Sequence, residues 1–256
     1  VKDFDFGGQL TIGMEHIEET QGKIIRILKL SNIVSKKYDI VITNPPYLGR
    51  RHIGANLVNY LDENYNNTAR DLFAVFMEKC NELLTMNGYY AMINQHSWMF
   101  LSSYESFRKE LLKTNSIVNM LHLGAGVFEG NEVGTLVQST AFIISKINVK
   151  YYNSVFLRLI NKTNKKDNAI HIINEGIDND LFYETNVENF GLIPGSPVAY
   201  WASNKIIDNY RRYPLMDEIC KPRQGMATCD NQRFLRLWHE VSNERIEFGC
   251  DNIKTC

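Results

Sequence analysis

The sequence predicts an α/β protein built on a mostly parallel sheet. Residues 38–43, "YDIVIT", are strand formers, and Asn44 and two prolines stop them abruptly. Strand-like and helix-like stretches then alternate over about the next hundred residues, which is typical of parallel strands joined by crossover helices. A hydrophobic fraction of 44% and a charged fraction of 22% are ordinary for a globular chain of 256 residues, long enough to bury a sizeable core.

The first half of the chain contains the elements around this strand. Residues 24–30 place apolar side chains at a weak helical spacing. Proline cannot donate to a β-ladder, so Pro45 ends the strand. The polar residues 49–67 predict a long loop. Thr68 and Asp71 form a capping-box pattern before an apolar helical stripe, whose helix is expected to end at Gly88.

The elements that follow repeat the alternation. Strands are expected at 89–94, 117–123 and 139–145. A helix lies between the first two, and Ser102 with Glu105 repeats the capping pattern at its start. Only a glycine-rich loop joins the last two strands, so we expect them to run antiparallel.

Beyond residue 150 the pattern changes. "VFLRLI" at 155–160 and "AIHII" at 169–173 flank a polar turn, which predicts a β-hairpin. A helix is expected to begin near Ser203.

Composition narrows the class of protein. The sequence shows no apolar run of the roughly 20 residues that cross a bilayer. Five cysteines, an odd number with no C-x-x-C pair, predict reduced thiols in a cytoplasmic protein. The net charge is -1, so any nucleic-acid surface must be a local patch.

Asn44 to Tyr47 stand where open α/β sheets bind ligands, beyond the carboxyl end of a strand. The Asn44 side chain offers a neutral acceptor, and the carbonyl of Pro45 offers a second. Tyr47 could stack on a ring that carries an amino group. The pattern favours a substrate with an aromatic or amide NH₂, although Asn-Pro and Pro-Pro also occur as plain turns.

"DIVITNPPY" resembles motif IV of the amino methyltransferases that use S-adenosylmethionine, in the form typical of adenine-specific DNA methyltransferases. "PGSPVAYW" and "KPRQGMATCDNQRFLRLW" are similar to stretches of the large adenine methyltransferases of BREX phage defence, which are related to type IIG restriction–modification enzymes. The resemblance covers most of residues 35–240. It implies the second half of a Rossmann-like methyltransferase fold in the cytoplasm, with double-stranded DNA and other defence subunits as partners.

The resemblance also implies roles for single residues. Asn44 and the Pro45 carbonyl would accept the hydrogens of the exocyclic amine of a flipped adenine, Pro46 would hold the turn rigid, and Tyr47 would stack on the base. An aromatic residue of motif VIII packs against the base in this family, and Phe142 and Phe128 are the candidates. No metal is required for direct methyl transfer, and the sequence contains no metal-ligand cluster.

The glycine-rich cofactor turn of the family is the main departure. Gly7 and Gly8 are the nearest match, but they lack a preceding strand and a following helix. The cofactor-binding residues therefore stay unassigned, and we expect the chain to be a fragment of a longer enzyme, inactive alone. Such a half-sheet should expose an edge or a face and self-associate through residues 38–43, unless the N-terminal segment covers it.

Three segments are predicted. Residues 1–150 are the catalytic part, 151–189 a hairpin and connector, and 190–256 the start of a target-recognition region. Between Lys205 and Arg236 seven basic residues outnumber four acidic ones, and this excess of three predicts a weak DNA-contacting patch. Its candidates are Arg211, Arg212, Lys221, Arg223, Gln224, Arg233 and Arg236.

Two other functions stay open. Glutamine methyltransferases of the release-factor type also use Asn-Pro-Pro-Tyr, because an amide is another planar NH₂. About 110 residues follow Ser145, which favours a substrate that needs more surface. The other alternative is an inactive fragment with a DNA-binding or assembly role.

Overall fold

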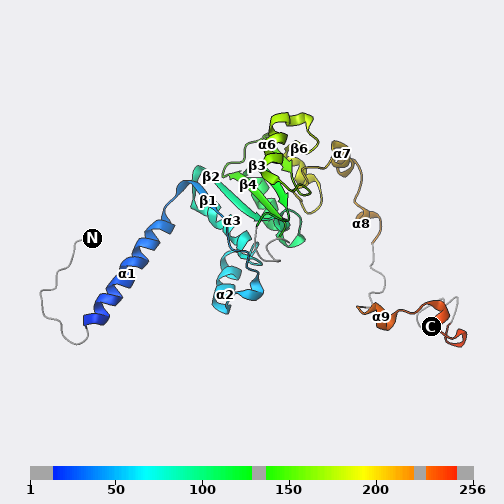
Figure 1. Cartoon of the computed structure of the whole chain (residues 1–256), viewed down its shortest axis with the longest axis horizontal. Coiled ribbons are helices and arrows are strands. Elements are labelled where there is room, and N and C mark those ends of the chain that lie inside the picture. The colour runs from blue at the N-terminus through cyan, green and yellow to red at the C-terminus, as the bar shows by residue number, and fades with distance from the viewer. Residues whose placement is uncertain (1–13, 129–136, 222–228, 247–256) are drawn as a thin grey trace. The chain divides into compact units, whose positions relative to one another are not determined.

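The computed structural model describes residues 14–128, 137–221 and 229–246. The chain divides into two compact units, Val1–Arg211 and Arg212–Cys256. The larger unit holds one six-stranded sheet and its helices (Figure 1). The described part of the smaller unit consists of short turns of helix: α8 Met216–Ile219, α9 Asn231–Phe234, η6 Trp238–Glu240 and η7 Asn243–Arg245.

The sheet has the strand order β1-β2-β4-β3-β5-β6. Its strands are β1 Tyr38–Thr43, β2 Leu84–Gln95, β3 Ser116–Gly124, β4 Ser139–Ser145, β5 Asn153–Arg158 and β6 Phe182–Asn186. β1 and β2 are parallel, as are β3 and β5, while β4 runs antiparallel between β2 and β3. The four strands predicted up to residue 145 are confirmed, and so is the antiparallel fourth strand. β1, β2, β3 and β5 end at one side of the sheet, which we call the carboxyl edge.

Helices connect the parallel strands as expected. The longer ones are α1 Met14–Ser35, α2 Ala55–Asn64, α3 Leu72–Leu83, α4 Glu105–Thr114, α6 Lys165–Glu175 and α7 Asn204–Arg212. α3 joins β1 to β2, and α4 joins β2 to β3. The helix expected near Ser203 is α7, and the weak spacing at 24–30 lies inside α1. Among the described residues, no helix is both long and apolar enough to span a bilayer.

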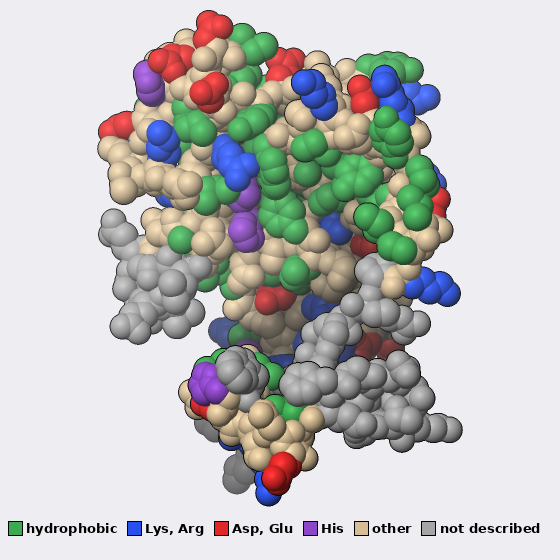
Figure 2. All heavy atoms as spheres, turned by 90° about the vertical axis from the view of Figure 1, so that its right-hand side faces the viewer, with side chains coloured by type: hydrophobic (Ala, Val, Ile, Leu, Met, Phe, Trp, Pro, Cys, Tyr) green, Lys and Arg blue, Asp and Glu red, His purple; other side chains and the backbone are tan. Residues whose placement is uncertain are grey.

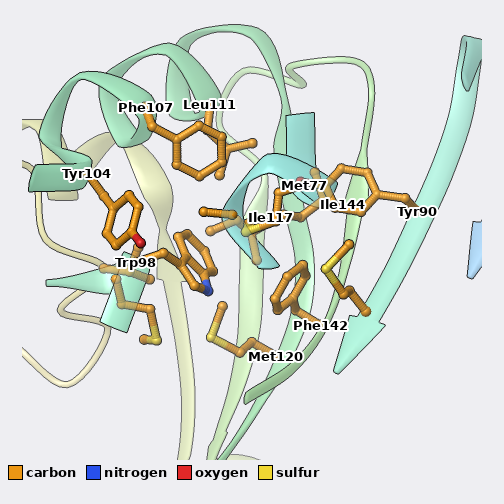
Figure 3. Close-up of a cluster of buried hydrophobic side chains, with 14 of the residues drawn as sticks. Met77, Tyr90, Trp98, Tyr104, Phe107, Leu111, Ile117, Met120, Phe142 and Ile144 are labelled. Carbon is orange, nitrogen blue, oxygen red and sulfur yellow. The ribbon is translucent and has the colours of Figure 1, made fainter. Parts of the chain in front are cut away.

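The main core lies between α3, α4 and one face of the sheet (Figure 3). Met77 of α3 and Phe107 and Leu111 of α4 are at most 5% exposed. They pack with strand residues such as Tyr90 and Ile144, which are fully buried. Burial of this many apolar groups is the main source of stability, at about 25 cal/mol per Å² of apolar surface.

The opposite face and the outer edge of the sheet are open near β1. Ile40 and Ile42 are 65% and 75% exposed. An apolar hollow of about 590 Å³ lies next to them, lined partly by Ala91, Leu121 and Ile143. Hydrophobic side chains also reach the surface on a different face, which Figure 2 draws from the right-hand side of Figure 1. Within the described part of the chain, β1 is therefore an exposed edge strand, as expected.

The loop predicted at 49–67 is wrong in its centre, where α2 forms. Asparagine is a weak helix former, so local propensity argued against a helix there. Packing reverses this preference, because Leu61 of α2 is 2% exposed and joins Tyr65, Ala69 and Val75 in a small separate core.

The predicted helix boundaries also need correction. Asp71, not Thr68, caps α3, and its side chain accepts from the N–H of Phe73. α3 ends at Leu83 instead of Gly88, which lies inside β2. A Cβ at Gly88 would lie 3.1 Å from the carbonyl oxygen of Asp39, so close strand pairing explains this glycine. Ser102 begins a turn of 3-10 helix, and α4 starts at Glu105 without a side-chain cap.

The predicted β-hairpin is wrong in its second strand. Residues 169–173 belong to α6, whose start is capped by the Asn164 side chain. Ile172 is 1% exposed while Ile170 and Ile173 are half exposed, so the isoleucines bury one stripe of a helix and not one face of a strand. β5 pairs antiparallel with β6 instead.

Candidate active site at the carboxyl edge

The turn from Asn44 to Tyr47 leaves β1 at the carboxyl edge. Asn44 and Pro46 are exposed, Pro45 is buried and Tyr47 is half buried. The alternation follows from the strand, because successive residues of an extended chain face opposite sides. Asn44 therefore presents its amide at the surface, and the buried Pro45 follows it.

The Tyr47 hydroxyl ties this turn to the next strand. It lies 3.2 Å from the carbonyl oxygen of Ile93 on β2 and 3.4 Å from Oδ1 of Asn44. Burial raises the pKa of Tyr47 to about 12, so the phenol stays protonated and can donate one hydrogen bond. The two acceptors compete for this one hydrogen, and the shorter contact is the one with Ile93.

Two aromatic rings surround Tyr47. Phe73 of α3 packs edge-on, with ring centroids 6.3 Å apart. Phe128, from the loop after β3, lies 6.0 Å away at an interplanar angle of 68°. The structure therefore brings together Tyr47 and one of the two phenylalanines predicted from the sequence. The other, Phe142, is 3% exposed and packs against Tyr90 and Trp98 in the core (Figure 3).

Asp71 braces the turn and was not predicted as part of the site. Its carboxylate accepts from the N–H of Leu48 at 3.0 Å while it caps α3. Burial raises the pKa of Asp71, and the backbone N–H groups that it accepts from oppose this rise. Leu72 also donates its N–H to the carbonyl of Leu48 at 3.2 Å. The sequence indicated Asp71 as part of a helix cap. It did not indicate the contact with Leu48, which lies 23 residues upstream.

The predicted basic residues lie in both units. Arg211 of the larger unit contacts Asp208 and Asn189. In the smaller unit Arg212 and Lys221 are exposed, and the guanidinium of Arg233 lies over the ring of Phe234. Arg236 donates to the backbone carbonyls of Gln232 and Leu235. Arg223 and Gln224 lie outside the described residues, and so do Gly7 and Gly8. Among the described residues we assign none to the cofactor.

The exposed Asn44 amide and the half-buried Tyr47 ring thus lie at the carboxyl edge of an open α/β sheet, which is where proteins of this fold class bind ligands. The Eco57I restriction-modification methylase family matches residues 11–128. The chain is 38% identical to the adenine-specific methyltransferase PglX of Lacticaseibacillus casei (strain Zhang), over 94% of the chain and 20% of that protein. It is 36% identical to the adenine-specific methyltransferase BrxX of Escherichia coli O9:H4 (strain HS), over 88% of the chain and 18% of that protein.

These matches confirm the expected resemblance to PglX-like adenine-specific methyltransferases. The chain spans about a fifth of the length of these two relatives. Among solved structures, a modification subunit of a putative type I restriction enzyme from Vibrio vulnificus YJ016 is 12% identical, with a TM-score of 0.48. That similarity covers 70% of this chain and 40% of the other.

Proposed function

We propose that the protein methylates the exocyclic amine of adenine in double-stranded DNA, as part of a restriction–modification or BREX-type defence system. The observation that carries the proposal is the exposed Asn44 amide, held beside the half-buried ring of Tyr47 at the carboxyl edge. The names of the relatives PglX and BrxX, both adenine-specific methyltransferases, support the same substrate.

In this proposal the turn binds an adenine that has left the duplex, because the amine is otherwise paired and out of reach. Oδ1 of Asn44 and the carbonyl of Pro45 each accept one hydrogen of the amine. This leaves the nitrogen lone pair free to attack. Bound S-adenosylmethionine would supply the methyl group and would leave as the thioether S-adenosylhomocysteine, while the nitrogen would lose one of its hydrogens as a proton.

Tyr47 and Phe128 provide the walls for the base. The Tyr47 ring stacks on the adenine, and Phe128, whose ring already lies beside it, packs at the base's other side or edge. The hydroxyl of Tyr47 holds the ring to β2 through Ile93. Pro46 keeps the turn stiff, which matters because an in-line displacement is sensitive to small errors of placement.

Replacement of Asn44 tests this function. In the full-length protein that carries these residues, Asn44→Ala should lower methyl transfer to DNA by at least about 10²-fold, the cost of removing one preorganised polar contact to the reacting group. DNA affinity should be retained. Asn174→Ala, at an exposed position on α6, is the matched control and should change neither quantity. Transfer near the wild-type rate in Asn44→Ala would contradict the assignment.

A further inference from the structure

A second cluster of polar and aromatic side chains lies along the carboxyl edge. His96 follows the end of β2, His122 lies near the end of β3, and Arg158 is the last residue of β5. Neighbouring strands are about 4.8 Å apart, so these residues lie roughly 5 to 19 Å from Asn44 along the edge. That distance corresponds to a few nucleotides at the 3.4 Å rise of one DNA strand.

Two histidines and a tyrosine form a hydrogen-bonded chain in this cluster. Nδ1 of His96 lies 2.9 Å from Nε2 of His122, and Nδ1 of His122 lies 2.9 Å from the hydroxyl of Tyr200. Burial and the neighbouring His96 and Arg158 lower the pKa of His122 to about 4, and burial lowers the pKa of His96. Both rings are therefore neutral near pH 7, each with one N–H and one lone pair.

The buried hydroxyl of Tyr200 determines which group donates at each step of this hydrogen-bonded series. Burial raises the pKa of Tyr200, so it keeps its hydrogen, and among the described residues His122 is its hydrogen-bond partner. A buried donor without an acceptor is costly, so Tyr200 donates to His122. His122 then donates from Nε2 to His96, and the remaining hydrogen of His96 is on its own Nε2. The hydrogen-bonded series therefore ends at the Nε2–H of His96, whose ring is half buried.

Arg158 adds a positive charge beside this donor. Its guanidinium carbon lies 4.7 Å from the ring centroid of Trp201, which is 37% exposed. In the described part of the chain no carboxylate lies within ion-pair distance of Arg158. Phe100 lies between Trp201 and His96, with ring centroids 5.6 and 5.5 Å away. The cluster thus combines unused donors, one charge and an exposed aromatic surface.

We propose that Arg158, His96 and Trp201 form a contact surface for the phosphodiester backbone of the DNA strand next to the target adenine. A guanidinium matches the geometry of a phosphate, and the neutral N–H of His96 offers a second donor to the same kind of oxygen. Trp201 packs against the adjoining sugar or base. The polar groups are donors only, which suits phosphate oxygens better than the mixed donor and acceptor edge of adenine. The proposal rests on the proposed function, which supplies the DNA.

The salt dependence of DNA binding tests this surface. Removing one phosphate contact by Arg158→Gln in the full-length protein should weaken binding to a duplex oligonucleotide severalfold. It should also lower the slope of log affinity against log salt by about 0.9. Arg158→Lys keeps the charge and should keep the slope. His96→Phe removes an uncharged donor and should weaken binding without changing the slope. Lys113→Gln lies near the opposite edge of the sheet, in the last turn of α4, and is the control.

The outcomes separate this surface from the proposed function. An unchanged affinity and slope in Arg158→Gln, with the fold intact by circular dichroism, would overturn the surface while loss of transfer in Asn44→Ala still supports the function. A weakened, flatter salt dependence together with normal transfer in Asn44→Ala would keep the surface and reject the function. If Arg158→Gln does not fold, the salt slopes of Arg158→Lys and His96→Phe test the surface instead. A change of slope in His96→Phe would contradict the role of His96 as an uncharged donor.

Discussion

Tyr47 shows how one side chain serves both packing and chemistry. Its ring is held at the edges by Phe73 and Phe128, and its hydroxyl reaches Ile93 and Asn44. A ring fixed in this way loses little freedom when a base stacks on it, which favours binding. The hydroxyl is a neutral donor, and such a hydrogen bond contributes only about 0.5–1.5 kcal/mol.

Substitution of Tyr47 separates these two contributions. Tyr47→Phe keeps the ring, so methyl transfer should stay within about tenfold of the wild type. Tyr47→Ala should lower it further, because stacking contributes about 1–3 kcal/mol per base. Steady-state transfer to a cognate oligonucleotide measures both. Equal losses in the two variants would mean that the hydroxyl, not the ring, is what the reaction needs.

At the scale of elements, one buried arginine joins α4 to the segment before Tyr200. Arg108 is 1% exposed and donates to four backbone carbonyls, those of Trp98, Leu101, Gly195 and Ser196. Burial lowers the pKa of its guanidinium, and Glu105 opposes this shift. No other side chain offers donors in so many directions, which explains an arginine here. The contact also fixes the chain that leads to Trp201.

Arg108→Met should therefore lower the free energy of unfolding by about 3 kcal/mol, because it leaves buried carbonyls without donors. Arg108→Lys should restore only part of this, since an ammonium cannot reproduce the planar fork. Urea unfolding followed by circular dichroism measures the loss. Lys109→Ala removes an exposed ion pair with Glu105 and should leave the free energy of unfolding nearly unchanged. A similar small cost for Arg108→Met would show that water replaces the guanidinium.

At the scale of the whole molecule, the open side of β1 is an exposed apolar feature of the sheet. Ile40 and Ile42 face solvent beside the apolar hollow. Among the described residues β1 pairs with β2 alone, so its outer backbone groups are free to pair with another strand. Both features favour association of one copy with another.

We expect the 256-residue chain to self-associate, with a mass that rises with concentration in sedimentation experiments. Ile42→Lys should reduce this association, because a lysine on an edge strand opposes strand pairing. Ile170→Lys introduces the same charge at a half-exposed position on α6 and should leave the association unchanged. A chain that sediments as a monomer at all concentrations would contradict the expectation.

The sequence by itself determined the strands of the sheet up to residue 145 and the turn that bears Asn44. These depend on local causes, namely strand-forming residues, the two prolines and the short glycine-rich stretch of sequence before residue 139. It also indicated Phe128 as one of two candidate partners for the base.

Only the tertiary structure decided which contacts join distant residues. It placed Phe128 rather than Phe142 beside Tyr47, turned residues 169–173 into a helix and gave β5 its partner in β6. The chain from His96 through His122 to Tyr200 joins residues 26 and 78 positions apart. Such contacts depend on how the strands are ordered in the sheet, and no local propensity or spacing carries that information.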